Sequence, residues 1–516
     1  MKRRTFLAGS VATATAFTFQ SPHAHYVPTP PDQTLDASEL ALNAARLREQ
    51  FLKEYDPAYV ENVILPHFLV SAFAGERVSL PMIGLALTKE NALPADLWGL
   101  ISESWKPSPE DGVTVFLQGL EKRGPENRRK RIYMSAVTPD LYRPMYGDKV
   151  TKYFDALLDD KNAGKPLMRT YLNTFWDLYW DLHLGVKGEA VPAEVRQIGE
   201  SFNTVLAYRD PTLRIVYDHY MTVRSNLALL KSWIDAKVAD VIAGRVRNPE
   251  KTFVHYWIKN GEEGENFRHE DVVFECFHNF VAFSQWGNSI YNVMLKLSPA
   301  LGDPDAQAWF KKTMTSSVDA SDGSAFTPLE RFVMELFRTI SPNGGSISAV
   351  EETSPAAFRR HGYIISPHTA ASLDPLHWKN PDTFDPSRYQ NAPTSHQIDE
   401  ARVKQMGFAQ CPFNRTAFAV KDGREATMHN SAFGTVYGIA QGKPLPVCDY
   451  AGFAPFGFGY RRCPGEQFTI QVFEDFLRKV WKDKISFVKL NTARAEPVPI
   501  GPTTVIEDNF GFTRAA

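Results

Sequence analysis

The chain has 516 residues, of which 43% are hydrophobic and 22% are charged, and its formal net charge at pH 7 is −2. A chain of this length and composition can bury a large core, which excludes a disordered protein. The small net charge gives no reason to expect nucleic acid or an anionic membrane surface as a partner. The four cysteines are few for a disulfide-built protein, and the lack of an apolar run of about twenty residues argues against a full transmembrane span.

The first residues resemble a twin-arginine export signal. Arg3 and Arg4 precede a Phe-Leu pair, and a mildly apolar stretch of Ala, Thr and Phe runs to about Phe19. We therefore expect residues 1–35 to be an export signal and linker, with cleavage after Ala24, and the protein to be exported to the periplasm. Two alternatives stay open, an uncleaved membrane anchor and an untargeted start, and the low hydrophobicity argues against the anchor.

No internal repeat and no low-complexity linker divides the rest of the chain, so we predict one domain over residues 36–516. Helix-favouring composition over 37–55 and helical patterns from Pro139 to Leu158 and over 165–245 predict a mainly α-helical protein. The region 69–83 is predicted to hold short strands. A basic run over 126–131 is typical of a solvated face.

The segment from Glu270 to Leu297 predicts one long helix. An acidic pair opens it, Pro299 follows it, and it is apolar nearly all round, which is typical of a helix buried at the centre of a large protein. Its polar residues recur at steps of three, four and seven and so form one stripe, namely His278, Gln285, Asn288 or Ser289, and Asn292. The stripe has two interpretations, satisfied hydrogen bonding inside the core or the wall of a pocket. Cys276, within the same segment, is predicted to be a packing residue.

A second helix is predicted over 329–338. Glu335 and Arg338 lie three residues apart on it, so their side chains share one face. Such pairs are common and carry little information alone. A Pro- and aromatic-rich run follows, from Asp374 through Trp378 to Arg388.

Residues 390–455 form a longer Gly-, Ala- and Phe-containing insert. Cys411 and Cys448 lie in it. Two interpretations stay open: a disulfide between them, which an oxidising compartment would permit, and two separate thiols.

The stretch from Phe456 to Gly465 combines one cysteine with glycines and arginine. Apolar residues at helical spacing follow it up to residue 477, so Cys463 lies just before a helix. Main-chain N–H groups and the helix dipole favour its thiolate there, and Pro464 is tolerated because first-turn N–H groups have no intrahelical partner. Gly465 permits a close approach to a flat cofactor. The pattern predicts a thiolate metal ligand.

The order of residues in this stretch resembles the heme-binding loop of the cytochrome P-450 superfamily. In that family the cysteine is the axial iron ligand and the arginine binds a heme propionate. The resemblance implies a mainly α-helical fold with a smaller β-rich portion and one heme b, iron protoporphyrin. It implies that Cys463 is the metal ligand and that the cofactor-binding residues include Cys463, Arg461, Phe456, Gly459 and Gly465.

Two further segments resemble the family. In the family a buried ionic network of one Glu and two Arg lies beneath the heme. The resemblance implies that Glu335, Arg338 and Arg388 form this network here and have a structural role. A His/Trp-x-x-x-Arg pattern of the family, which binds a propionate, is met here by Asn127 and Arg131. The resemblance implies that Arg131 is cofactor-binding, whereas Asn127 departs from the pattern.

The long helix departs from the family. In oxygen-activating members it carries Ala-Gly-x-Asp/Glu-Thr, whose acid and alcohol deliver protons to dioxygen. Aligned on Ala282, this sequence lacks both, because Gln285 cannot cycle a proton and Trp286 has no hydroxyl. The window 283–288 resembles instead a Phe-Asn-x-aromatic-Gly-Gly stretch of plant allene oxide synthases and hydroperoxide lyases. The candidate catalytic residues on this helix are Ser284, Gln285 and Asn288.

The family resemblance implies a heme-thiolate oxidoreductase that inserts oxygen into a small apolar organic or lipid substrate, as a monooxygenase or a peroxide-driven peroxygenase. One alternative is non-redox rearrangement of lipid hydroperoxides, and another is a heme-binding protein without turnover. The missing acid and alcohol, together with export, argue against a nicotinamide-dependent reductase as a redox partner. We expect a monomer that does not bind nucleic acid.

Overall fold

The computed structural model describes the following residues: 132–208, 214–261, 269–316, 318–319, 322–324, 326–342, 345–349, 363–367, 372–373, 378–391, 417–419, 425–427, 436–440, 443–448, 453, 455–456, 463–491, 495–502 and 504–514. Several predictions fall outside these residues: the export signal over 1–35, the helix over 37–55, the strands over 69–83, and the roles of Arg131, Gly459, Arg461 and Cys411.

The described part of the chain is mainly helical. Its longer helices are α9 (Gly147–Leu157), α10 (Leu167–Leu184), α11 (Ala193–Tyr208), α12 (Arg214–Ile242), α13 (Phe253–Asn260), α14 (His269–Leu297), α15 (Pro304–Thr315), α16 (Pro328–Ile340) and α20 (Glu466–Lys482). Short helical turns are α8 (Pro139–Leu141), η3 (Tyr142–Tyr146), η4 (Asp160–Asn162), η5 (Gly188–Ala190), η6 (Pro249–Lys251) and η7 (Pro386–Tyr389). No helix among the described residues is long and apolar enough to cross a membrane.

The strands of the described segments pair in antiparallel twos. The pairs are β1 (Gly345–Ala349) with β2 (Tyr363–Pro367), β3 (Ala417–Ala419) with β4 (Glu425–Thr427), β5 (Val436–Ala440) with β6 (Lys443–Cys448), β7 (Ile485–Lys489) with β10 (Phe510–Arg514), and β8 (Pro497–Gly501) with β9 (Thr504–Glu507). The predicted fold class, mainly α-helical with a smaller β portion, is therefore confirmed.

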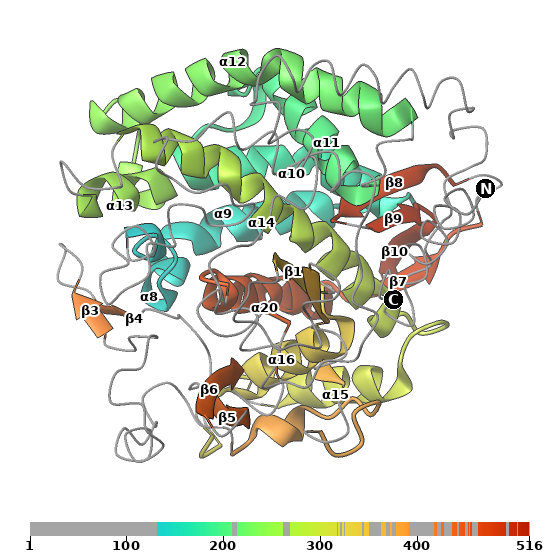
Figure 1. The fold of residues 1–516 in the computed structure, drawn as a ribbon. Coiled ribbons are helices and arrows are strands. Elements are labelled where there is room, and N and C mark those ends of the chain that lie inside the picture. The colour runs from blue at the N-terminus through green and yellow to red at the C-terminus, as the bar shows by residue number, and fades with distance from the viewer. Residues whose placement is uncertain are drawn as a thin grey trace, which may run out of the picture.

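Helix α14 runs through the centre of the molecule. Figure 1 shows it between α12 and α11 on one side and α20 and α16 on the other. The sequence predicted this helix over Glu270–Leu297, and it begins one residue earlier. Its apolar side packs in an aromatic core, where the ring of Phe280 lies 4.7 Å from that of Trp176 and 5.0 Å from that of Tyr179.

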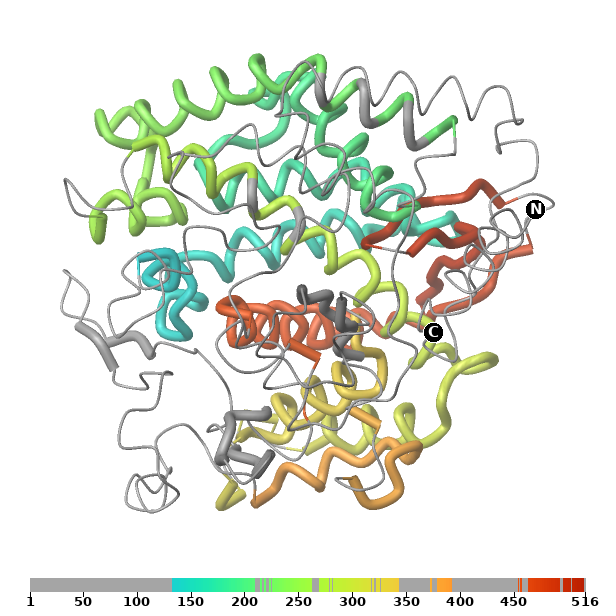
Figure 2. Tube along the Cα trace, in the orientation of Figure 1, coloured from blue at the N-terminus to red at the C-terminus, as the bar shows by residue number. Residues whose placement is uncertain are grey.

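Strand β8 packs directly on α14, although the two are separated by about two hundred residues of chain. Figure 2 shows the C-terminal strands lying against the helices of the N-terminal half. A Cβ atom on Gly287 would lie 2.2 Å from the carbonyl oxygen of Ile500, so a glycine is required where the strand crosses the helix. The Nδ2 of Asn203 on α11 donates to the carbonyl of Pro499 at 2.6 Å and fixes the strand from its other side.

Helix α16 has a complete N-terminal capping box. The Thr327 hydroxyl accepts from the N–H of Glu330 at 3.2 Å, and the Glu330 carboxylate accepts from the N–H of Thr327 at 2.7 Å. The cap begins the helix at Pro328, and the Glu335 and Arg338 side chains consequently lie on its buried face.

Candidate functional site

Cys463 lies three residues before the start of α20. Its main-chain N–H donates to the carbonyl of Phe456 at 2.8 Å, which closes the loop between them. The N-cap of α20 is Gly465, and no side chain caps the helix. The first turn of α20, which has no side-chain cap, therefore lies directly after the half-buried Cys463, an arrangement that favours a thiolate. A Cβ on Gly465 would lie 3.8 Å from the Cys463 sulfur, so Gly465 borders the thiol.

Aromatic rings hold this loop and α20 in place. Phe456 packs on Phe337 of α16 with ring centroids 5.0 Å apart. Phe468, the third residue of α20, stacks on Trp286 of α14 at 6.1 Å with an interplanar angle of 15°. These contacts place Cys463 beside the point where the central helix and α20 meet.

The predicted polar stripe of α14 divides into two parts. Asn288 and Asn292 are buried and form core hydrogen bonds: Asn288 Nδ2 donates to the Pro342 carbonyl at 2.9 Å, and Asn292 Nδ2 donates to Asn288 Oδ1 at 2.6 Å. Ser284 is also buried, with its carbonyl 3.1 Å from a Cβ built on Gly501. Thus Ser284 and Asn288 lie toward β8, and the two asparagines make the buried hydrogen bonds that the core interpretation requires.

The other part of the stripe borders open space. Ala282 is exposed and Gln285, three residues later on the same side, is half-buried, whereas Phe283, Ser284 and Trp286 are buried. The Oε1 of Gln285 is enclosed and accepts no hydrogen bond from any residue that the structure describes. The side chain of His278 lies outside what the structure describes.

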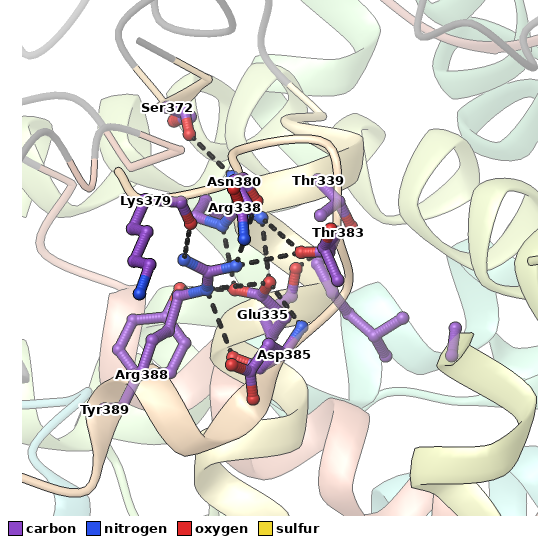
Figure 3. A network of polar contacts seen from close by, with 12 residues as sticks. Glu335, Arg338, Thr339, Ser372, Lys379, Asn380, Thr383, Asp385, Arg388 and Tyr389 are labelled. Atoms are coloured by element: carbon purple, nitrogen blue, oxygen red, sulfur yellow. Dashed lines mark hydrogen bonds and ion pairs between the residues drawn. The ribbon is translucent and has the colours of Figure 1, made fainter. Parts of the chain in front are cut away.

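A buried ionic network surrounds Glu335 (Figure 3). Arg338 donates twice to its carboxylate, from Nε and Nη2, at 2.8 Å each. Arg388 Nε donates at 3.1 Å, the Asp385 N–H at 2.9 Å and the Tyr389 hydroxyl at 2.9 Å. The structure thus brings together the three residues named from the sequence, and the side chains of Glu335 and Arg338 have no exposed surface.

The network extends into the main chain around it. Arg338 Nη1 donates to the Ser372 carbonyl at 2.9 Å, and Arg388 Nη1 and Nη2 donate to the Lys379 carbonyl at 3.1 Å and the Thr383 carbonyl at 2.9 Å. Burial alone lowers the pKa of Arg338, but the hydrogen bonds and charge of Glu335 outweigh it and raise that pKa. The two arginines therefore tie α16 to η7 and to the residues that precede it.

Tyr389 is a member of the network that sequence reasoning missed. It is fully buried, and burial together with the charge of Glu335 raises its pKa well above the usual value. It directly follows Arg388, at the end of the Pro- and aromatic-rich run. The hydroxyl of a Tyr in that position was the signal that an additional donor to Glu335 was present.

A second buried polar chain links three segments and was not predicted. The Tyr133 hydroxyl donates to Asn279 Oδ1 at 2.6 Å, and Asn279 Nδ2 lies 3.0 Å from His183 Nε2. His183 Nδ1 lies 2.8 Å from the Tyr179 carbonyl, so this nitrogen carries the proton and Nε2 accepts. Burial lowers the pKa of His183 to about 3, which keeps the ring neutral. Burial first, and then the charges of Glu275 and Cys463, raise the pKa of Tyr133.

Cys276 is fully buried on α14, and burial raises its pKa, in keeping with the packing role predicted for it. Cys448 ends strand β6, and its pairing with Cys411 stays a prediction.

The described residues fit a heme held by Cys463. The thiol lies at an uncapped helix N-terminus with Gly465 beside it. Across from α20, helix α14 has an exposed alanine, Ala282, and an enclosed amide oxygen, Gln285 Oε1, that accepts no hydrogen bond from the described residues. A cofactor seated between the two helices would cover the exposed Ala282.

No protein-family model and no curated protein matches the sequence. Solved structures do match. The cytochrome P-450 CYP102L1 aligns over 94% of this chain and 99% of its own, with 11% sequence identity and a TM-score of 0.51. The chain has a cytochrome P-450 fold. The heme domain of cytochrome P-450DA aligns over 84% of this chain and 85% of its own, with 12% sequence identity and a TM-score of 0.49. Cytochrome P-450EX alpha, solved with myristic acid, aligns over 77% of this chain and 80% of its own, with 16% sequence identity and a TM-score of 0.47.

Proposed function

We propose that this chain is a heme-thiolate oxidoreductase, with Cys463 as the axial ligand, that inserts oxygen into a small apolar organic or lipid substrate. The observation that carries the proposal is the position of Cys463, at the uncapped N-terminus of α20 in a chain with a cytochrome P-450 fold. When bound, the heme would supply redox chemistry in which a thiolate donor favours O–O cleavage.

The residues of the chain have separable tasks in this proposal. The helix N-terminus and the bond between the Cys463 N–H and the Phe456 carbonyl hold the sulfur as an oriented thiolate. The Glu335 network holds η7 against α16, which supports the loop through the contact of Phe456 with Phe337. On the other helix, the methyl group of Ala282 offers an apolar contact to substrate.

A second candidate function is the rearrangement of lipid hydroperoxides. Residues 283–288 of α14 favour this rearrangement, because oxygen-activating cytochromes P-450 carry an acid and an alcohol in this part of the helix. Gln285 and Trp286 stand there, and neither side chain can pass a proton to dioxygen.

The reduced holoprotein with carbon monoxide tests the ligand. A red-shifted thiolate band is expected for the parent protein and for Cys276→Ala, a control at a buried cysteine, and Cys463→Ser is expected to lose the band. Heme bound by the parent protein without that band contradicts the assignment.

Three assays of the holoprotein separate the reactions. They are a fatty acid with hydrogen peroxide, a fatty-acid hydroperoxide alone, and a fatty acid with a reductase and NADPH. Product in the first or third supports oxygen insertion, and product in the second alone supports rearrangement. No product in any of them indicates a heme-binding protein without turnover.

We also propose export directed by the first residues. The support is the Arg3-Arg4 pair and the mildly apolar stretch behind it. Replacement of both arginines by lysine is expected to retain the protein in the bacterial cytoplasm, as measured by cell fractionation. Equal periplasmic yield of parent and variant would exclude the twin-arginine route.

A further inference from the structure

A cavity that includes no residue of the Cys463 loop lies where α15, α16 and η7 meet. It has a volume of about 340 Å³, and its walls include Trp309 and Thr313 of α15, Arg331 of α16 and Pro386 of η7. Figure 1 shows α15 and α16 together on the side of α20 that is remote from α12. A cavity of this volume is large enough for a small organic molecule.

The cavity wall carries an excess of positive charge, because its cations are Lys312 and Arg331 and its carboxylate is Asp322. Arg331 already holds this carboxylate, with Nη1 and Nη2 donating to its two oxygens at 2.9 and 2.7 Å. These hydrogen bonds lower the pKa of Asp322 to about 2, so it is ionised at neutral pH and stays paired with Arg331.

The ammonium group of Lys312 is left for another anion. Its Nζ lies 4.1 Å from the centre of the Trp309 ring, and no carboxylate of the described residues pairs with it. The contact with the ring holds the ammonium at the cavity, where it can meet a negatively charged group.

Thr313 contributes a hydroxyl that is also unused. The residue is 4% exposed and lines the cavity, and its hydroxyl makes no hydrogen bond with a described residue. The two serines of the wall differ, because Ser316 Oγ donates to the Thr313 carbonyl at 2.7 Å and Ser387 Oγ to a neighbouring carboxylate at 2.6 Å. The Thr313 oxygen is not fully enclosed, so a ligand in the cavity can accept its proton in a hydrogen bond.

Flat apolar side chains complete the wall. Pro328 of α16 and Pro386 of η7 line the cavity together with the Trp309 ring. On α15, Lys312 and Thr313 follow Trp309 by three and four residues, so the ring, the ammonium and the hydroxyl share one face of the helix. The cavity therefore places ring surfaces beside one cation and one hydrogen-bond donor.

We propose that this cavity binds a small aromatic carboxylate, with its ring against Trp309 and the two prolines and its carboxylate on Lys312 and Thr313. An inorganic anion would leave the ring surfaces uncovered, and a neutral arene would leave the ammonium and the hydroxyl unused. The site is separate from the proposed heme site and does not depend on the proposed function.

Titration calorimetry of the holoprotein with 1-naphthoate and its uncharged analogue 1-naphthamide tests the proposal. Lys312→Met removes the charge at similar length and is expected to weaken 1-naphthoate binding by roughly fivefold, the value of an exposed ion pair, while 1-naphthamide binding stays unchanged. Thr313→Val removes the hydroxyl at equal shape and is expected to weaken binding of both by roughly fivefold, the value of one hydrogen bond. Its urea midpoint is expected not to fall, because the parent protein loses no hydrogen bond.

The same helix supplies matched controls. Lys311 and Thr315 do not line the cavity, and the Thr315 hydroxyl donates to the Lys311 carbonyl at 2.8 Å. Lys311→Met and Thr315→Val are expected to leave both affinities unchanged. The proposal is overturned if Lys312→Met and Thr313→Val bind 1-naphthoate as the parent does, if Lys312→Met weakens both ligands equally, or if the parent binds no 1-naphthoate.

A photoreactive carboxylate locates the site directly. After illumination of the holoprotein with 4-benzoylbenzoate, peptide mass spectrometry is expected to find label on peptides that contain residues 309–331 or 386–390. An excess of 1-naphthoate should remove that label. Label confined to other peptides overturns the proposal, because the aromatic acid then binds elsewhere.

Discussion

Replacing Glu335 by Gln tests whether the buried network stabilises the fold. The carboxylate of Glu335 accepts five hydrogen bonds, three of them from arginines, and its side chain has no exposed surface. Gln keeps the shape but removes the charge, and its amide nitrogen would face donors. Leaving Arg338 buried without its counter-charge is expected to cost about 3–5 kcal/mol in the free energy of unfolding.

Urea unfolding of the purified protein measures this cost, with the slope required to stay unchanged. Tyr389→Phe removes one hydrogen bond to the same carboxylate and is expected to cost less, about 1.5–3 kcal/mol. Asp322→Asn is the control, because its pair with Arg331 involves a side chain that is 42% exposed, and a loss below about 1 kcal/mol is expected. The reasoning is refuted if Glu335→Gln costs no more than Asp322→Asn. For Glu335→Ala we expect purified protein without heme, and a stable, heme-replete variant would contradict the assigned role.

Three further predictions concern pH, the second polar chain and the crossing of β8. Burial, reinforced by the charge of Glu330 and opposed by Arg478 and Arg143, raises the pKa of Glu474 from 4.5 to about 7. The native state therefore binds this proton more tightly than the unfolded chain, so the free energy of unfolding should fall by up to about 3 kcal/mol between pH 4.5 and 7. Glu474→Gln should flatten this pH dependence of the free energy of unfolding, and the exposed control Glu496→Gln should not. An unchanged pH dependence in Glu474→Gln would show that another group is responsible. Asn279→Leu leaves the Tyr133 hydroxyl and His183 Nε2 without their shared partner. It should lower the free energy of unfolding, measured in urea, by about 2–5 kcal/mol, which is more than Tyr133→Phe should cost. An equal cost for the two variants would argue against the hydrogen-bonded link between Tyr133, Asn279 and His183. Gly287→Ala should destabilise the protein by more than about 1 kcal/mol, because its Cβ would lie 2.2 Å from the Ile500 carbonyl, and a thermal midpoint equal to that of the parent would contradict the close crossing.

Local patterns in the sequence were sufficient for several elements. The apolar run with acidic residues at its start predicted α14 to within one residue. The spacing of Glu335 and Arg338 placed both on one face of α16, because residues three apart on a helix are neighbours. The apolar residues after Cys463 predicted that it lies just before a helix, since a helix start is set by local sequence.

The allocation of the α14 polar residues was beyond local pattern. Periodicity puts Gln285 and Asn288 in one stripe, but the partner of Asn288 is the Pro342 carbonyl, 54 residues further along the chain. Only that packing separates a core asparagine from a glutamine that borders open space. Equally, Tyr133, Asn279 and His183 are each unremarkable in sequence and acquire a role because the fold brings residues 146 positions apart into hydrogen-bond contact.

By itself, then, the sequence determined the elements whose signals are local: the helices, the position of Cys463 before one of them, and the two charges on α16. The tertiary structure decided which buried polar groups find a hydrogen-bond partner among the described residues and which do not. The physical reason is that burial and hydrogen-bond partners depend on segments distant in the chain, such as β8 crossing α14 at Gly287 and Tyr389 reaching Glu335 from 54 residues away.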